Sequence, residues 1–242
     1  MENPNLSFAF VQKQLKNPPH WSEDVLLAWH DAYPRDCHAF VTKHYWSDEA
    51  SVNVFNVVGT DHWDYQDKTW LSFLQGGKRM VHNLQKLEDN PDYYLNLSSR
   101  HPRIHYYTTD GLQYYVGSDG NHRTCLARFF LFEQAQAYLH RVTVDHFQVD
   151  WLFYDLYKRF RQLIIAQQLP YELTATTKTI GREDTAGWKT DLFEPRVILY
   201  NRKLVTEDIL DYKQLLEKML AIQTTQVKQG GVKVTFWRRF FS

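Results

Sequence analysis

The sequence predicts an α+β protein in which a small mixed sheet with flanking helices is extended by helices and strands at both ends. Residues 104–116 have the pattern of a β-hairpin, residues 122–137 have the apolar spacing of a helix, and residues 138–149 alternate as a strand. With 242 residues, 43% of them hydrophobic, the chain can bury a large core. We expect an N-terminal extension over 1–75, a core over 76–150 and a C-terminal extension over 151–242.

The composition excludes several classes of protein. A charged fraction of 23% beside 16% aromatic residues is not that of a disordered chain. No segment reaches the roughly 20 apolar residues of a membrane-spanning helix, and the N-terminus lacks the pattern of a secretory signal. Two cysteines, Cys37 and Cys125, are too few for a disulfide framework and favour a reducing compartment. We therefore expect a soluble, cytoplasmic protein with no membrane partner.

Charge is distributed unevenly along the chain, although its formal net charge is zero. Residues 1–65 carry 4 basic and 9 acidic side chains, whereas residues 151–242 carry 15 basic and 10 acidic ones. The zero balance gives no overall argument for nucleic-acid binding, but a basic C-terminal third could form an interaction surface. Attraction between the two oppositely charged ends is the alternative explanation.

The first third is expected to contain one helix and one strand. Residues 24–33 have helical spacing of apolar side chains, and Ser22 stands at the expected start of this helix. Residues 50–58 alternate as a strand does, and residues 60–67 follow as a polar, aromatic loop.

The middle third has the clearest pattern. Helices are expected over 78–87 and 92–97, separated by Asn90-Pro91. The hairpin strands 104–108 and 113–116 are joined by Asp110-Gly111, because this pair supplies the positive φ angles of a two-residue turn.

The last third begins with an aromatic helix over 151–168, whose apolar residues cover most of its circumference and so predict burial. A polar stretch containing Gly181 and Gly187 follows as a connection, then a strand over 196–201. Thr206 has the position of an N-cap for a helix running to about residue 223. Gly230-Gly231 breaks the chain before a final strand over 232–236.

The densest signal is the segment 117–123, GSDGNHR, between the hairpin and the next helix. Glycines allow a sharp turn and close approach of a ligand, and a helix N-terminus attracts an anion. Arg123 could bind phosphate through two hydrogen bonds, and His122 could donate or carry a proton. A cation in the first turn is locally unfavourable, and a bound anion would offset this cost. An ordinary connection has the same composition and stays open as the alternative.

Residues 101–128, HPRIHYYTTDGLQYYVGSDGNHRTCLAR, resemble the signature of the ParB/sulfiredoxin-like superfamily. His101-Pro102 stands at the position of the Gln-Pro segment in that family, and Asp110-Gly111 stands at the hairpin turn. The run from Asp119 to Arg123 stands at the motif that opens the helix. The resemblance covers about residues 76–150 and implies a ParB/sulfiredoxin-like core.

Members of that superfamily bind nucleotides with this loop and helix start. The resemblance therefore implies a nucleotide, ATP or CTP, as the cofactor, with Mg²⁺ as a further ligand. It is compatible with a nucleotide hydrolase or with a DNA-associated factor of a plasmid or other mobile element, and it leaves DNA and a homodimer open as partners. The implied nucleotide-binding residues are Gly117, Ser118, Gly120, Asn121, His122, Arg123 and Thr124, and the implied catalytic residues are Asp119 and His122.

Two departures from the pattern of that superfamily narrow the choice of activity. Sulfiredoxin-like members carry a catalytic cysteine immediately before His-Arg, where this chain has Asn121. Cys125 lies inside the helix and is expected to be a small buried residue, so a sulfiredoxin is not expected. No pair of short helices with a glycine turn follows the core, so a complete chromosomal partition protein is not expected either. Asp119 could orient a metal or activate a nucleophile, or simply bind backbone N–H groups of the turn.

Two other classes of function stay open. The first is a non-enzymatic scaffold that binds DNA or protein and keeps a vestigial pocket, and the second is a small-molecule phosphotransferase similar to free-serine kinases. The histidines lack the spacing of a zinc site, so no metal ligands are predicted. The tail 233–241, KVTFWRRFF, suits single-stranded nucleic acid or an edge strand. The candidate nucleic-acid contacts are Lys233, Trp237, Arg238 and Arg239.

Overall fold

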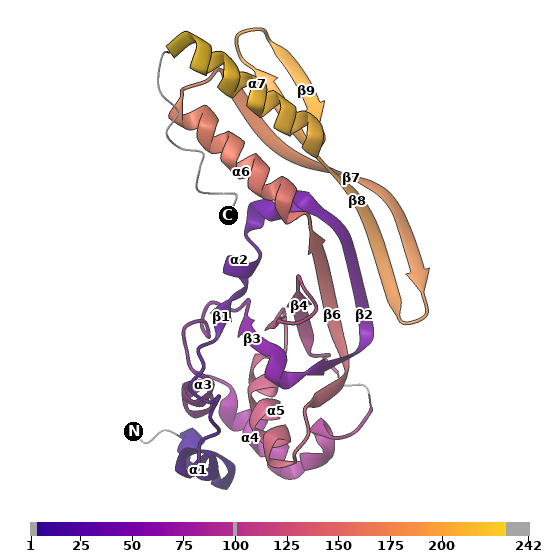
Figure 1. Ribbon diagram of the computed structural model, residues 1–242. Helices are drawn as coiled ribbons and strands as arrows, with labels where there is room; N and C mark the ends of the chain where they lie inside the picture. The colour runs from indigo at the N-terminus through magenta and orange to yellow at the C-terminus, as the bar shows by residue number, and fades with distance from the viewer. Residues whose placement is uncertain (1–3, 99–100, 231–242) are drawn as a thin grey trace. The chain divides into compact units, whose positions relative to one another are not determined.

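The computed structural model describes residues 4–98 and 101–230, the side chains of 225–230 excepted (Figure 1). It confirms the α+β class, since helices accompany a mixed sheet. The chain forms two compact units. The first contains residues up to 35, residues 43–149 and residues 181–192, and the second contains residues 36–42, residues 150–180 and residues from 193 onward.

A mixed sheet organises the first unit. Its strands are β1 (Leu27–Ala28), β2 (Val41–Asn53), β3 (Val57–Thr60), β4 (His105–Thr108), β5 (Tyr114–Val116), β6 (Tyr138–Val149), the last part of β7 (Tyr171–Thr185) and the first part of β8 (Trp188–Asn201). The order is β1-β3-β5-β4-β6-β2-β8-β7. Strands β4 and β5 are antiparallel, with Tyr107 opposite Tyr115, whereas β4 and β6 are parallel, with Tyr107 opposite Asp145. The sheet therefore brings together four segments that are distant in the sequence, residues 27–60, 105–116, 138–149 and 181–192.

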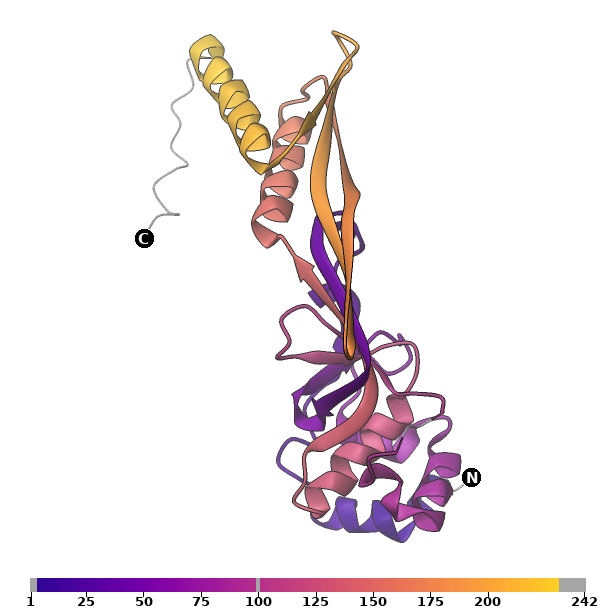
Figure 2. The ribbon, with the colours of Figure 1, turned by 90° about the vertical axis from the view of Figure 1, so that its right-hand side faces the viewer.

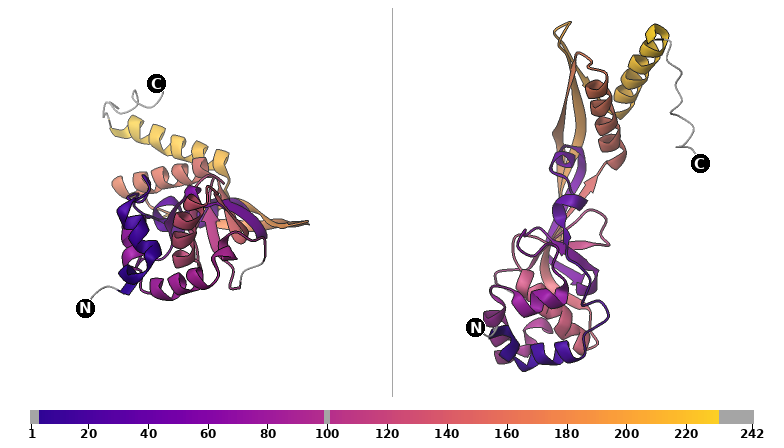
Figure 3. Two further views of the ribbon diagram at one scale, coloured as in Figure 1. Left: turned by 90° about the horizontal axis from the view of Figure 1, so that it is seen from below. Right: turned by 90° about the vertical axis from the view of Figure 1, so that its left-hand side faces the viewer.

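Four helices, α1 (Ala9–Lys16), α3 (Trp70–Gly76), α4 (Met80–Asp89) and α5 (Asn121–Glu133), gather at one end of the first unit (Figures 1 and 3). Helix α5 is the central one: it contacts α3 and α4, and every residue from Thr124 to Leu131 is buried. The helical segments of the unit are η1 (Pro4–Ser7), α1 (Ala9–Lys16), α2 (Trp29–Ala32), η3 (Val54–Asn56), α3 (Trp70–Gly76), α4 (Met80–Asp89), η4 (Pro91–Tyr94) and α5 (Asn121–Glu133).

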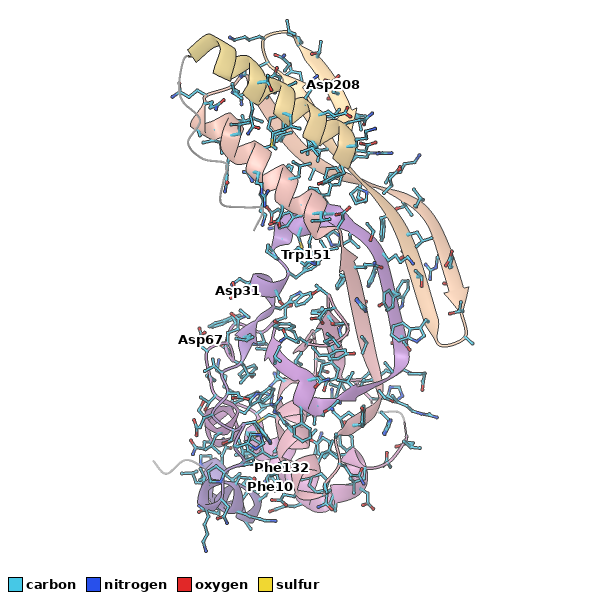
Figure 4. The ribbon with its side chains drawn as sticks, viewed as in Figure 1. Phe10, Asp31, Asp67, Phe132, Trp151 and Asp208 are labelled. Carbon is cyan, nitrogen blue, oxygen red and sulfur yellow. The ribbon has the colours of Figure 1, made fainter. Side chains whose placement is uncertain are left out.

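The core of the first unit lies between these helices and the sheet. Trp70, Phe73, Tyr106 and Phe129 are all less than 2% exposed. Figure 4 places the labelled side chain of Phe132 at the helical end of the unit, where its ring lies 5.8 Å from that of Trp21. The aromatic residues that are frequent in the sequence thus supply much of the buried apolar surface that stabilises this unit.

The second unit combines helices with strands. Its elements are η2 (Arg35–Phe40, from Asp36 on), α6 (Trp151–Ala166), β7 (Tyr171–Thr185, to Ile180), the second part of β8, β9 (Thr206–Leu210) and α7 (Tyr212–Gly230). Helices α6 and α7 lie side by side (Figures 1 and 2). Strand β9 pairs antiparallel with β8, with Asp208 opposite Leu199. The ring of Phe40 packs against Phe153 and Tyr157 of α6 at 5.2 and 5.3 Å.

Several expected elements are confirmed. Strand β6 covers the predicted residues 138–149, and α5 and α6 begin within one residue of their predicted starts. Helix α4 and strands β4 and β5 also lie where the sequence predicts them, and Cys125 is buried inside α5 as expected. Among the described residues, none of the helices combines the length and the hydrophobicity that a membrane crossing requires.

The prediction of a single helix over 24–33 is wrong. Leu27 and Ala28 form a strand that pairs in parallel with Gly59 and Thr60, and only the four residues of α2 are helical. The apolar spacing reflects burial of Leu26 and Trp29 on either side of this short strand. Ser22, the expected helix start, is buried in a turn.

The two-residue hairpin turn is also wrong. Strands β4 and β5 are joined by the five residues 109–113, in which Gly111 has a φ of +71°. The Asp110 carboxylate accepts hydrogen bonds from the N–H groups of Leu112 and Gln113 and so stabilises this wider loop.

The C-terminal third differs most from the prediction. The polar stretch around Gly181 and Gly187 forms long strands, β7 and β8, and Thr206 begins strand β9 instead of a helix. Helix α6 is not buried all round, because Leu152 and Ile165 are 74% and 68% exposed. The predicted strand 232–236 and the candidate nucleic-acid contacts Lys233, Trp237, Arg238 and Arg239 lie outside the described residues.

Candidate functional site

A pocket of about 460 Å³ opens in the first unit at the start of α5. One wall is formed by α4 and η4, and the other by residues 101–102 and the first turn of α5. Five residues of the predicted motif, Asp119 to Arg123, line it. The sequence prediction thus locates the pocket, and the structure adds residues of α4 that the motif does not contain.

The two glycines of the motif make room for the protein's own side chains. Gly120 has a φ of +114°, and a Cβ atom there would lie 2.6 Å from Ile104 Cγ2. A Cβ atom at Gly117 would lie 3.0 Å from the ring of Tyr107. Both positions therefore need glycine for backbone conformation or packing. Packing against Ile104 and Tyr107 thus accounts for both glycines, and only Gly120 also lines the pocket.

Arg123 is directed onto groups of the protein itself. Its Nη1 atom donates to the Tyr93 hydroxyl at 2.9 Å and to the Pro102 carbonyl at 2.5 Å, and its Nη2 atom lies 3.2 Å from the Asp119 carboxylate. The side chain is 13% exposed. Burial alone would lower the pKa of Arg123, but the bond to Tyr93 and the charge of Asp119 outweigh burial and raise it. Arg123 therefore holds the pocket wall together, and the predicted two-bond grip on phosphate is not available in this arrangement.

The two predicted catalytic residues are also engaged in local structure. His122 Nε2 accepts the backbone N–H of Arg79 at 3.2 Å and lies 3.4 Å from the Tyr65 hydroxyl. Burial, with the nearby charge of Arg79, lowers the pKa of His122 to about 4. The ring is thus neutral at pH 7 and its acceptor nitrogen is occupied, which does not suit a proton carrier. Asp119 is paired with Arg123, one turn further along the chain.

The remaining predicted residues divide between the pocket and its surroundings. Asn121 lines the pocket, but its side-chain oxygen accepts the Thr60 hydroxyl at 2.6 Å and is buried. Thr124 is fully buried, 2.9 Å from the Tyr106 hydroxyl. Gly117 and Ser118 do not line the pocket, and the Ser118 hydroxyl lies 2.8 Å from His105 Nδ1. The side chains of the motif are therefore largely structural, although the residues of its helix start line the pocket.

Two cations of the pocket are absent from the sequence prediction. Arg79 and Lys86 line it from the start and the last turns of α4, and both are exposed. Neither side chain forms a hydrogen bond or an ion pair within the described parts of the chain. The apolar spacing of its residues predicts helix α4. The sequence near α4 does not indicate that the polar face of this helix lies against the start of α5.

Comparisons of the chain with protein-family models, with curated proteins and with solved structures found no match. The chemistry of the pocket residues is therefore what indicates a ligand. Within the described residues, no group of three histidine, cysteine, aspartate or glutamate side chains is arranged to hold a metal ion. Burial raises the pKa of Cys125, so this thiol does not have the low pKa of a reactive cysteine.

Proposed function

We propose that the first unit binds a phosphorylated small molecule, a nucleotide, in the pocket between α4 and the start of α5. The observation that carries this proposal is the combination of a helix start and unpaired cations on one cavity of about 460 Å³. Cavities of 300–1,000 Å³ hold most small ligands and cofactors. The volume thus admits a nucleotide.

The charge of the pocket supports an anion as the ligand. Arg79, Lys86 and Arg123 line it together with two carboxylates, those of Asp89 and Asp119, which leaves a formal charge of +1 before its histidines are counted. The Asp119 carboxylate is already paired with Arg123, so Arg79 and Lys86 provide most of the uncompensated charge. We assign them the phosphate-binding role that the sequence predicted for Arg123.

The backbone of α5 supports the same ligand. Gly120 is the N-cap and no side chain caps the first turn, within the described chain. The first N–H groups of a helix have no partner within the helix, and the helix dipole places partial positive charge there. Because Gly120, Asn121 and His122 line the pocket, these N–H groups are available to phosphate oxygens.

The proposal concerns binding and includes no reaction in this pocket. Asp119 and His122 are both engaged in contacts of the pocket wall. Neither of these two residues is therefore free to act as the acid or base of a hydrolysis or a phosphoryl transfer. Mg²⁺ would enter with the nucleotide phosphates and not as a resident ion. Tyr93, which is partly buried in the pocket wall, offers a ring on which a base could stack. The DNA and mobile-element roles stay predictions from the resemblance.

The test is a thermal shift measurement on the whole chain with ATP, ADP, CTP, GTP and pyrophosphate, each with and without Mg²⁺. A ligand at 100 times its Kd stabilises the folded state by about 2.7 kcal/mol, which corresponds to a rise in Tm of several degrees. Arg79→Ala combined with Lys86→Ala should abolish the rise. Lys43→Ala, which removes an exposed cation from strand β2, is the matched control and should keep it.

Two results would contradict the proposal. The first is the absence of any shift with all five ligands at millimolar concentration. The second is a shift of equal size in the wild type and in the variant that lacks both cations, since the ligand would then lie elsewhere. A response to pyrophosphate as large as that to ATP would assign most of the affinity to the phosphates.

A further inference from the structure

Four side chains that the proposed function does not use form a continuous hydrogen-bonded chain in the first unit. The Ser118 hydroxyl lies 2.8 Å from His105 Nδ1, and His105 Nε2 is hydrogen-bonded to one carboxylate oxygen of Asp145. The other oxygen of Asp145 lies 2.6 Å from His44 Nε2. The residues come from three neighbouring strands, β4, β6 and β2, and from the loop that precedes α5.

The sheet holds this chain in place. In the parallel pair of β4 and β6, His105 lies opposite Thr143, two residues before Asp145, so the imidazole and the carboxylate point to the same face. The side chains of His105 and Asp145 are 18% and 15% exposed. A Cβ atom at Gly117 would lie 3.3 Å from the His105 ring, so the glycine lets the loop bring Ser118 against that ring. Ser118 itself is exposed to solvent.

The carboxylate fixes where the imidazole hydrogen lies. Burial would raise the pKa of Asp145, but hydrogen bonds from His105 and His44 outweigh burial and lower the pKa to about 2. An ionised carboxylate only accepts hydrogen bonds, so His105 Nε2 carries the hydrogen in that bond. In the neutral ring Nδ1 then has a free lone pair, and this atom accepts the Ser118 hydroxyl hydrogen.

We propose that Ser118 is a nucleophile, that His105 is its general base, and that Asp145 is the positioning residue for His105. A nucleophile and a base within hydrogen-bond reach, with the base oriented by a third group, is the arrangement that activates a serine hydroxyl. Either ring nitrogen can act as the base, provided that the carboxylate holds the hydrogen on the other. This proposal does not depend on nucleotide binding.

The surroundings indicate an ester with an apolar or aromatic acyl group as the substrate class. The His105 ring meets Tyr107 edge to face at 4.7 Å, and the His44 ring stacks on Phe147 at 4.5 Å. Tyr107 and Phe147 are both partly exposed, so aromatic surface is available beside His105 and His44. Apolar surface of this kind binds apolar acyl groups and attracts phosphates less than the cationic pocket does.

The reaction proceeds in two balanced steps. Ser118 Oγ forms a bond to the carbonyl carbon, its proton moves to His105 Nδ1 and then to the departing alcohol oxygen, and the bond between carbonyl carbon and ester oxygen breaks. Water then attacks the acyl-serine, giving one proton to His105 and releasing the carboxylic acid as the proton returns to Ser118 Oγ. No oxidant, reductant or metal takes part.

The test treats the whole chain with a fluorophosphonate probe and with p-nitrophenyl acetate, and locates the modification by peptide mass spectrometry. The proposal predicts one phosphonyl group per chain, on Ser118, and turnover of p-nitrophenyl acetate with acetyl-Ser118 as the intermediate. Ser118→Ala should remove the label, and Ser118 is exposed, so this variant should fold. Ser51→Ala is the matched control, because the Ser51 hydroxyl also lies 2.8 Å from a histidine nitrogen, that of His140. This variant should be labelled like the wild type.

The roles of the other two residues have separate readouts. His105→Ala should lower the labelling rate at least 100-fold, and added imidazole should restore part of it, which a merely structural defect would not allow. Asp145→Asn should lower kcat for p-nitrophenyl acetate at unchanged KM. A wild-type chain that is folded by circular dichroism but is not modified at Ser118 would overturn the proposal. Labelling of Ser51 as fast as that of Ser118 would do the same, since a nearby histidine alone would then suffice.

Discussion

Replacing Arg128 by methionine should destabilise the first unit by roughly 3 kcal/mol. Arg128 lies in the middle of α5 and is 4% exposed. Its Nη1 atom donates to the carbonyl oxygens of Val54 and Val57 at 3.0 and 2.6 Å. The guanidinium also lies 4.6 Å from the ring centroids of both Trp21 and Trp70. One side chain therefore joins the central helix to η3 and to the first residue of β3.

The magnitude follows from these contacts. Each buried carbonyl that loses its donor costs about 1–3 kcal/mol, and a desolvated cation–π contact contributes about 2 kcal/mol. Burying the guanidinium is itself unfavourable, because burial lowers the pKa of Arg128 to about 10 and its Nε atom has no hydrogen-bond partner within the described residues. Removing the charge relieves this cost and so offsets part of the lost stability. Methionine keeps much of the apolar contact with the two tryptophans. The net loss is therefore roughly 3 kcal/mol.

The assay is urea unfolding of the full chain, followed by tryptophan fluorescence. Arg159→Met is the matched control, since Arg159 is an exposed residue of α6, and it should change the free energy of unfolding by less than about 0.5 kcal/mol. A change of that small size in Arg128→Met would refute the reasoning, because the buried guanidinium would then contribute no net stability.

Three further predictions concern the pocket wall and the thiols. His122 should lower the free energy of unfolding by about 2.5 kcal/mol between pH 6.5 and pH 4, because the unfolded histidine binds a proton below pH 6.5 whereas burial lowers the pKa of folded His122 to about 4. His122→Gln should therefore show a smaller pH dependence in urea unfolding. Gly120→Ala should lower the free energy of unfolding by more than about 2 kcal/mol, since φ is +114° and the new Cβ atom would lie 2.6 Å from Ile104 Cγ2. Gly76→Ala should cause no loss, because nothing lies within 4 Å of a Cβ atom there. Thermal melts of both variants check this. Cys37 and Cys125 should resist iodoacetamide in the folded chain and react in urea, because both are buried and burial raises the pKa of both thiols; fast labelling of either in the native protein would contradict the burial described.

The sequence predicts elements best where burial alternates or repeats regularly. Strand β6 alternates apolar and polar residues over 142–145 and again over 146–149, and α6 has a dense apolar repeat ended by Pro170, so both are found at their predicted places. Strand β7 is rich in threonine and most of its residues are exposed, so it lacks the apolar signal of a strand. Strand β1 is formed by Leu27 and Ala28 only because Gly59 and Thr60 lie beside them. Such pairing depends on residues that are distant in the sequence, so the local spacing of apolar residues does not predict it.

The candidate site was predictable in position and less so in the roles of its residues. The glycine-rich turn before α5 indicated the helix start that lines the pocket. The inward contacts of Arg123 depend on Tyr93 and Pro102, which only the fold brings near. The hydrogen-bonded chain from Ser118 to His44 likewise joins three strands and a loop that are distant in sequence. Side-chain partners of this kind are set by sheet order and register, which the sequence motif does not specify.

The most direct measurement is a titration of the ¹⁵N-labelled chain with ATP and with pyrophosphate, followed by the backbone amide resonances. If phosphates bind at the start of α5, the amide signals of Gly120, Asn121 and His122 should shift together and saturate with one Kd. The double variant with Arg79→Ala and Lys86→Ala should show no such shifts at the same concentrations. Saturating shifts confined to other parts of the chain, or none at millimolar ligand, would contradict a phosphate pocket at this helix.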